Sequence, residues 1–85
     1  MRVLIPSALH AYTASRQVEA SGATLAALLA ELDRQYPGIR FRIVDEQDRT
    51  RAHIRVFVNG EQVFDLGHPL SPGDEVAIVQ ALSGG

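Results

Sequence analysis

The chain has 85 residues, no cysteine and a formal net charge of −2 at pH 7. That length fits one small domain over residues 1–85, and the lack of cysteine excludes disulfide bonds and thiolate chemistry. Charges of both signs are spread along the sequence, so we expect no binding to nucleic acid. The apolar start over residues 1–6 is too short for a signal peptide or a membrane span, so we expect a cytoplasmic domain that does not bind a membrane.

The beginning of the chain predicts a pair of strands. Residues 2–6 are mainly apolar and residues 16–20 alternate weakly, whereas residues 7–15 between them are small and polar. Alternation over a few residues is typical of a half-buried strand. We therefore expect two strands that pair as a hairpin, joined by a loop over residues 7–15.

One amphipathic helix follows. Apolar side chains recur with the spacing of a single helix face, at Leu25, Leu28, Leu29, Leu32 and Tyr36. Thr24 is the predicted N-cap, because its hydroxyl can accept a hydrogen bond from an amide of the first turn. Pro37-Gly38 ends the helix, since the residue before a proline avoids the helical conformation.

The second half of the chain predicts three more strands. Residues 39–52 are irregular, with room for a short helical turn before a charged loop. The expected strands cover residues 53–58, 61–64 and 75–81. Asn59-Gly60 predicts a tight hairpin turn between the first two of these strands, because both residues tolerate a positive φ.

These elements define an α+β domain with the order β-β-α-β-β-β, in which one main helix covers one face of a mixed sheet. Successive strand residues point to opposite faces, so Ile54, Val56 and Val58 should face the helix. The opposite face would then present an apolar patch near the end of the chain, made of Leu4, Phe57 and Val79. Such a patch is typical of a docking surface, although scattered apolar residues are also common on protein surfaces.

No catalytic site or metal site is expected. The three histidines, His10, His53 and His68, sit in different segments without the spacing of metal ligands. The sequence ends instead in Leu82-Ser83-Gly84-Gly85, directly after an apolar strand. Glycine has no Cβ and wide backbone freedom, so a flexible tail over residues 82–85 could enter a narrow active site of another protein. We expect the carboxylate of Gly85 to be the reactive group.

Several motifs together resemble the ThiS/MoaD superfamily of β-grasp sulfur carriers. They are residues 68–77 (HPLSPGDEVA), residues 56–60 (VFVNG), residues 36–39 (YPGI) and the final Gly84-Gly85. The resemblance covers the whole chain in order and length. One feature departs from part of the family. Many molybdopterin synthase small subunits carry a proline-rich stretch with an aromatic residue before the diglycine, whereas residues 79–83 of this chain are VQALS.

The resemblance implies a ubiquitin-like β-grasp fold and a role as a carrier, not an enzyme. A ubiquitin-activating-type adenylyltransferase would use ATP to adenylate Gly85, while the chain itself binds no cofactor. A desulfurase or a rhodanese-like donor would then supply sulfur to form a thiocarboxylate, which a biosynthetic enzyme would accept. Gly84, Ser83 and Leu82 would thread the partner's active site, and the patch of Leu4, Phe57 and Val79 would dock the activating enzyme.

Three alternatives remain open at this point. The chain could be the small subunit of molybdopterin synthase, held in a stable complex with a catalytic large subunit. It could be a ubiquitin-like modifier joined through Gly85 to lysines of target proteins; the chain has no lysine of its own to accept such a bond. It could also be a β-grasp binding module with an accidental diglycine. The oligomeric state and the pathway that receives the sulfur, whether molybdopterin, cysteine, thiamine or a specialised metabolite, are likewise open.

Overall fold

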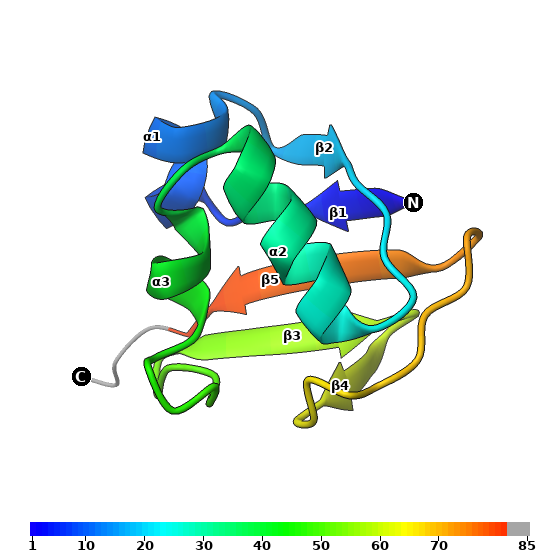
Figure 1. Cartoon of the computed structure of the whole chain (residues 1–85). Helices are drawn as coiled ribbons and strands as arrows, with labels where there is room; N and C mark the ends of the chain where they lie inside the picture. The colour runs from blue at the N-terminus through cyan, green and yellow to red at the C-terminus, as the bar shows by residue number, and fades with distance from the viewer. Residues whose placement is uncertain (82–85) are drawn as a thin grey trace.

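The computed structural model describes residues 1–81, which form one mixed sheet covered by helices on one face (Figure 1). The strands are β1 (Arg2–Leu4), β2 (Gln17–Glu19), β3 (Ile54–Val58), β4 (Glu61–Val63) and β5 (Glu75–Gln80). The helical segments are the 3₁₀ turn η1 (Ser7–Leu9) and the helices α1 (His10–Thr13), α2 (Leu25–Gln35) and α3 (Ile39–Ile43).

The strand order in the sheet is β2-β1-β5-β3-β4. β1 and β5 run parallel, while the β1–β2, β3–β4 and β3–β5 pairs are antiparallel. The predicted fold class is therefore confirmed: this is the α+β, ubiquitin-like β-grasp arrangement, with a mixed sheet around one main helix. β5 occupies the centre of the sheet, so the chain after it leaves from a central strand.

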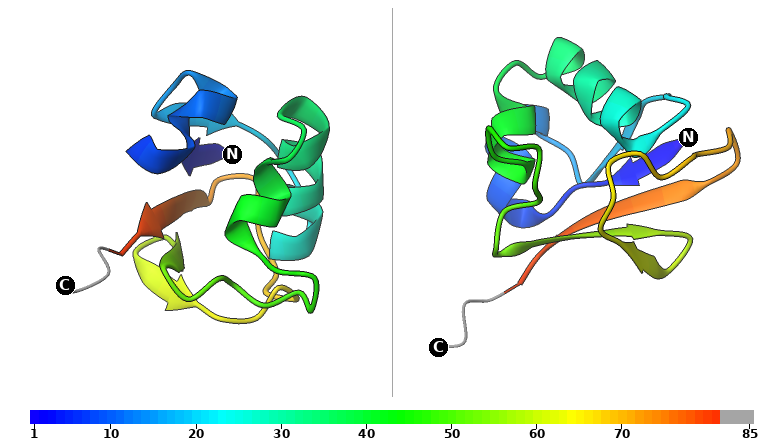
Figure 2. Two further views of the ribbon diagram at one scale, coloured as in Figure 1. Left: turned by 90° about the vertical axis from the view of Figure 1, so that its left-hand side faces the viewer. Right: turned by 60° about the horizontal axis from the view of Figure 1, so that its bottom comes forward.

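The two views of Figure 2 show α2 lying over one face of the sheet, and the buried core residues lie between this helix and that inner face. Val3, Val56 and Val76 are each at most 1% exposed, and they come from three adjacent strands. Leu28, Leu29 and Leu32 of α2 are fully buried against them. The predicted inward faces of the strands and of the helix are confirmed, because alternation and the i, i+3, i+4 spacing both describe local geometry.

Two connecting segments differ from the expectation. The predicted loop over residues 7–15 contains η1 and α1, and it buries Leu9 and Thr13. The sequence pattern missed these elements because three or four residues are too few to show a helical period. In residues 39–52 the expected helical turn is present as α3, whose Ile39 and Ile43 lie one turn apart and are fully buried.

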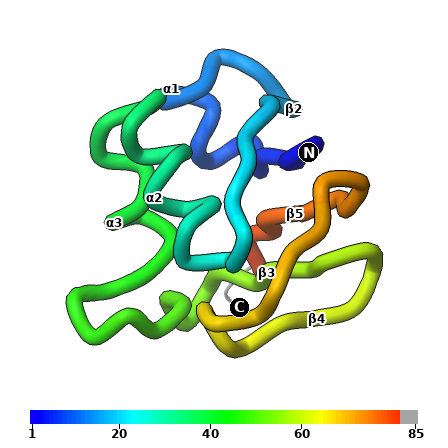
Figure 3. The backbone as a smooth tube through the Cα atoms, turned by 45° about the vertical axis from the view of Figure 1, so that its right-hand side comes forward, coloured from blue at the N-terminus to red at the C-terminus, as the bar shows by residue number. Residues whose placement is uncertain are grey.

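The first turn of α2 is held by a segment from far along the chain. The Thr24 hydroxyl accepts a hydrogen bond from the amide of Ala27 at 3.2 Å, so the predicted N-cap is confirmed. The amides of Leu25 and Ala26 donate to the carbonyls of His68 (3.0 Å) and Leu66 (2.8 Å). Figure 3 shows the β4–β5 connection passing beside this end of the helix. The loop thereby satisfies amides that a helix cannot satisfy itself.

Two turns that carry the family motifs meet at one end of the sheet. Asn59 adopts a positive φ of 51° in the β3–β4 turn, and its Nδ2 donates to Asp74 Oδ1 at 2.9 Å. The amide of Glu75 donates to Asn59 Oδ1 at 2.9 Å, and the amide of Ser71 donates to Asp74 Oδ2 at 2.8 Å. These motif residues therefore join the β3–β4 turn to the start of β5.

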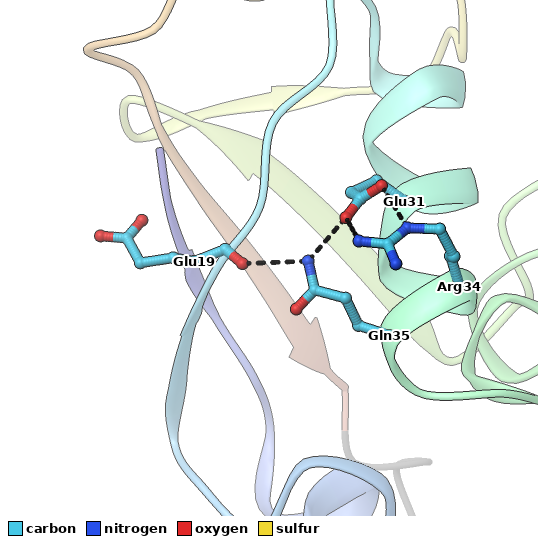
Figure 4. A network of polar contacts seen from close by, with 4 residues as sticks. All are labelled: Glu19, Glu31, Arg34 and Gln35. Atoms are coloured by element: carbon cyan, nitrogen blue, oxygen red, sulfur yellow. Dashed lines mark hydrogen bonds and ion pairs between the residues drawn. The ribbon is translucent and has the colours of Figure 1, made fainter.

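A polar network on α2 links the helix to β2 (Figure 4). Arg34 donates to both carboxylate oxygens of Glu31, and Gln35 Nε2 donates to Glu31 Oε2 at 2.9 Å. The same Nε2 reaches the carbonyl of Glu19 at 3.4 Å. Hydrogen bonds from Arg34, and then from Gln35, lower the pKa of Glu31 from 4.5 to about 2.

We expect stability to fall in acid through such carboxylates. The folded pKa of Glu31 is depressed, so its contribution is present above pH 4.5 and is lost as the pH falls toward about 2. The pKa values of Asp45 and Asp74 are also lowered, first by backbone amides that donate to them. The urea midpoint should stay level from neutral pH to about pH 5 and then decrease.

Glu31→Gln is the matched variant for this measurement, since it keeps the shape of the side chain and removes the titrating group. Its urea midpoint should decrease less steeply over the same acid range. The difference should be small and should shrink in high salt, because the Glu31–Arg34 pair lies on the surface. An acid dependence identical to that of the wild-type protein would show that the ion pair contributes nothing.

Candidate functional site

The three residues of the predicted docking patch lie on adjacent strands and on the outer face of the sheet. Leu4 of β1 is opposite Ala77 of β5, and Phe57 of β3 is opposite Ala77 from the other side. Leu4, Ala77 and Phe57 therefore form one row across the sheet. Val79 lies two residues further along β5, opposite Arg55. The structure thus places the predicted patch on one continuous surface.

The exposure of this surface differs from the expectation. Val79 is 42% exposed, but Leu4 and Phe57 are half-buried. The register gives the reason, because each of these two residues has an outward neighbour on both sides. Leu4 lies between Gln17 and Ala77, and Phe57 lies between Gln62 and Ala77. The patch is therefore an apolar surface that neighbouring side chains partly cover, and of its three residues only Val79 is well exposed to solvent.

Two further phenylalanines are exposed that the sequence pattern did not predict. Phe64 is 80% exposed and Phe41 is 57% exposed. The exposure of Phe64 could have been predicted from the alternation of side chains along a strand. Its neighbour Val63 is buried in the core, so Phe64 must point to the opposite face. Phe41 lies on the outer side of α3, and the guanidinium of Arg51 sits 4.5 Å from the centre of its ring. That contact is a cation–π interaction.

The point from which the tail begins is fixed by the sheet. The amide of Ala81 donates to the carbonyl of His53 at 2.8 Å, which extends the β3–β5 pairing to the end of the described residues. The predicted tail residues Leu82, Ser83, Gly84 and Gly85 lie outside those residues. The described domain thus presents the start of the tail at the end of its central strand.

The prediction that the chain has no catalytic or metal site rested on the positions of its three histidines. His10 Nε2 lies 3.1 Å from the carbonyl of Ile5, whereas His53 is exposed beside Ala81 and His68 lies in the β4–β5 connection. Within residues 1–81 no group of three or more histidine or carboxylate side chains could hold a metal ion. None of the helices described here combines the length and the apolar character that crossing a membrane requires.

Comparison with known proteins identifies similar chains. The model of the ThiS family matches residues 3–85. The sulfur carrier protein CysO of Mycobacterium tuberculosis is 35% identical over 89 residues, which cover 98% of this chain and 96% of that protein. The crystal structure of the Amycolatopsis orientalis BexX/CysO complex contains a chain with 33% identity and a TM-score of 0.90, covering 99% of this chain and 98% of the other.

A second similar solved structure is that of a protein named as a modifier and not as a sulfur carrier. SAMP1 from Haloferax volcanii, a small archaeal modifier protein, is 31% identical with a TM-score of 0.79. The match covers 100% of this chain and 98% of the other. These likenesses extend over nearly the full length of each chain, so they concern the whole β-grasp domain and not a shared fragment.

Proposed function

Because the chain belongs to the ThiS family, we propose that it is a sulfur carrier whose Gly85 carboxylate is activated and loaded with sulfur. Family membership also makes it a carrier and not an enzyme, as expected from the sequence. The observation that carries the proposal is the likeness to the sulfur carrier CysO over 98% of the chain. The family model, moreover, matches through residue 85.

The chemistry of the proposal follows from the weak reactivity of a carboxylate. A partner adenylyltransferase of the ubiquitin-activating type binds ATP, and the Gly85 carboxylate attacks the α-phosphate while pyrophosphate leaves. The terminal sulfur of a persulfide on a desulfurase or a rhodanese-like donor then attacks the acyl carbon and displaces AMP, which gives an acyl disulfide. A thiol of the partner attacks the donor's sulfur in this disulfide, forms a new disulfide with the donor and releases the acyl sulfur. The product is a thiocarboxylate, and the chain itself holds no cofactor. Gly84, Ser83 and Leu82 would thread through the partner's narrow channel.

The acceptor that we propose is an enzyme of cysteine biosynthesis in the cytoplasm. The relatives named CysO favour this branch. The BexX/CysO complex supports the expectation that such carriers bind partner enzymes directly. For this chain, we propose that the row of Leu4 and Phe57 with Val79 makes the apolar part of that contact, since all three lie on the outer face of the sheet and Val79 is two residues before Ala81.

The second candidate function is protein modification through Gly85, which the likeness to a small archaeal modifier protein favours. In that case the activated carboxylate would form an amide with a lysine of another protein. Both functions begin with the same adenylation, so the fate of the acyl group distinguishes them.

Intact mass spectrometry tests the first function. The protein is produced together with its adenylyltransferase and sulfur donor, and we expect the mass increase of one oxygen atom replaced by sulfur. Deletion of Gly85 should abolish the increase, whereas Ser83→Ala should retain it, because that change leaves the terminal diglycine in place. Unmodified wild-type protein under conditions in which ATP is consumed would refute the sulfur-carrier function.

Digestion of the cellular proteins tests the second function. The last arginine of the chain is Arg55, so trypsin would leave residues 56–85 on a modified lysine, which is too long for routine detection. A Ser83→Arg variant solves this problem, since trypsin then leaves only Gly-Gly on the target. Gly-Gly remnants that depend on Gly85 would support modification, and their absence from cells that form the thiocarboxylate would exclude it.

A further inference from the structure

Three surface hollows adjoin one another on the β3 side of the end of β5. The first, of about 470 Å³, lies between α1 and the ends of β3 and β5, and it contains Arg42, His53 and Gln80. The second, of about 240 Å³, shares Arg42 and His53 with the first. The third, also of about 240 Å³, shares Arg51 with the second. The basic and aromatic side chains that line the second and third hollows form what we call the basic collar: Phe41, Arg42, Arg51, His53, Arg55 and Phe64.

The arginines of the basic collar have no ion-pair partner in the described part of the chain, and the same holds for Arg16 and Arg49. Within residues 1–81, no carboxylate oxygen lies within 4.0 Å of Arg42, Arg51 or Arg55, whereas three other arginines have ion-pair partners. Those pairs are Arg2–Glu75, Arg34–Glu31 and Arg40–Asp48. The positive charge of the basic collar is therefore not neutralised by direct contacts in the described part of the chain.

The collar arginines are nevertheless held in position. Arg42 Nε donates to the Tyr12 hydroxyl at 2.9 Å, and this contact raises the pKa of Arg42. Arg51 Nε donates to the carbonyl of Phe41 at 2.6 Å, and Arg55 donates through one terminal nitrogen to the carbonyl of Ala52 at 2.7 Å. The remaining guanidinium nitrogens have no hydrogen-bond partner among residues 1–81. An oriented guanidinium loses less entropy when it binds a carboxylate.

The basic collar also contains aromatic surface. Phe41 and Phe64, together with Val79, are the large apolar side chains that are exposed in residues 1–81. Phe64 shares a hollow with Arg51 and Arg55, while Val79 is opposite Arg55 in the sheet. Arginine and aromatic residues are the types most enriched at the energetic centres of protein interfaces. This composition favours a protein partner.

The separation of Ala81 and Gly85 along the sequence limits where that partner can lie. Gly85 is the fourth residue after Ala81, and four extended residues span at most about 14 Å. If Gly85 reacts in another protein's active site, as proposed above, the entrance of that site must approach Ala81 within this distance. The surface around the entrance would therefore contact the basic collar.

We propose that the basic collar docks an acidic protein surface around the entrance of the active site that takes up Gly85. Aspartate and glutamate side chains around this entrance would pair with Arg42, Arg51 and Arg55, because carboxylates accept paired hydrogen bonds from guanidinium groups.

Charge reversal tests the basic collar in the loading reaction. Arg42→Glu, Arg51→Glu and Arg55→Glu are compared with Arg16→Glu, which makes the same charge change at an exposed arginine outside the basic collar. We expect each collar variant to lower kcat/KM for thiocarboxylate formation by at least about tenfold in about 0.05 M salt, with kcat unchanged. In about 0.5 M salt the difference from the wild type should largely disappear.

The control should change kcat/KM by less than about twofold. An equal loss in Arg16→Glu, or full activity in all three collar variants, would overturn the proposal. Circular dichroism verifies that each variant is folded. Arg42→Lys adds a second comparison, since it keeps the charge and should retain more activity than Arg42→Glu.

A binding experiment keeps this proposal separate from the proposed function. The wild-type protein is titrated with a hexaglutamate peptide while its backbone amide signals are followed by NMR. We expect shifts confined to residues 41–42, 51–55 and 64, even if no thiocarboxylate forms in the loading reaction. Shifts spread evenly over all arginine-containing segments would refute the basic collar. Tighter binding of a single-stranded RNA than of the peptide would overturn the assignment to a protein partner.

Discussion

Gly22→Ala is expected to lower the free energy of unfolding by about 3 kcal/mol. A Cβ at position 22 would lie 2.4 Å from the backbone nitrogen of Leu28 and 2.8 Å from the carbonyl carbon of Ala27. Both atoms belong to α2, so no side chain can rotate away to make room. The segment before Thr24 would have to move off the helix, together with the cap that Thr24 provides.

Gly73→Ala is the matched control for this measurement. Nothing lies within 4 Å of a Cβ at position 73, and Gly73 is not in the positive-φ region. Urea denaturation should therefore show little loss of stability for Gly73→Ala, or a gain of a few tenths of a kcal/mol from the reduced freedom of the unfolded chain. Equal midpoints for the two variants would show that the contact between Gly22 and α2 does not limit stability.

Phe57→Arg is expected to reduce kcat/KM for loading of Gly85 by about a hundredfold, the effect of losing one central interface residue. Phe57 lies in the apolar row on the outer face, between Gln62 and Ala77. The substitution adds a positive charge near the basic collar, so attraction to an acidic partner would persist. A loss of loading would therefore report the apolar contact itself.

Ala30→Arg is the matched control, because it places the same side chain on the exposed side of α2, in the other layer of the fold. This variant should load normally. The urea midpoint of Phe57→Arg should change little, since the side chain is half-buried and lies outside the core. Normal loading of Phe57→Arg would refute the docking role of the row, and unfolding of the variant would show that Phe57 is needed for the sheet.

The sequence predicted the candidate site unevenly, and the register of the sheet explains why. The faces of Leu4, Phe57 and Val79 follow from alternation within each strand, which was assigned correctly. The exposure of Leu4 and Phe57 depends on what stands beside them in neighbouring strands. Alternation cannot supply that information, because it contains no strand order. For the same reason the cluster of Arg42, Arg51 and Arg55 could not be seen in the sequence, where these residues follow no single period.

The sequence by itself determined the α+β class, the limits of α2 from its Thr24 cap to Tyr36, and the inward faces of the strands. Each of these follows from interactions within a few residues, such as the cap, the helical period and strand alternation. Only the tertiary structure decided that β5 lies between β1 and β3 and that the β4–β5 connection caps α2. These features, like the basic collar beside Ala81, arise from contacts between segments far apart in the chain. Long-range packing decides which segments come together, and local sequence patterns contain no information about it.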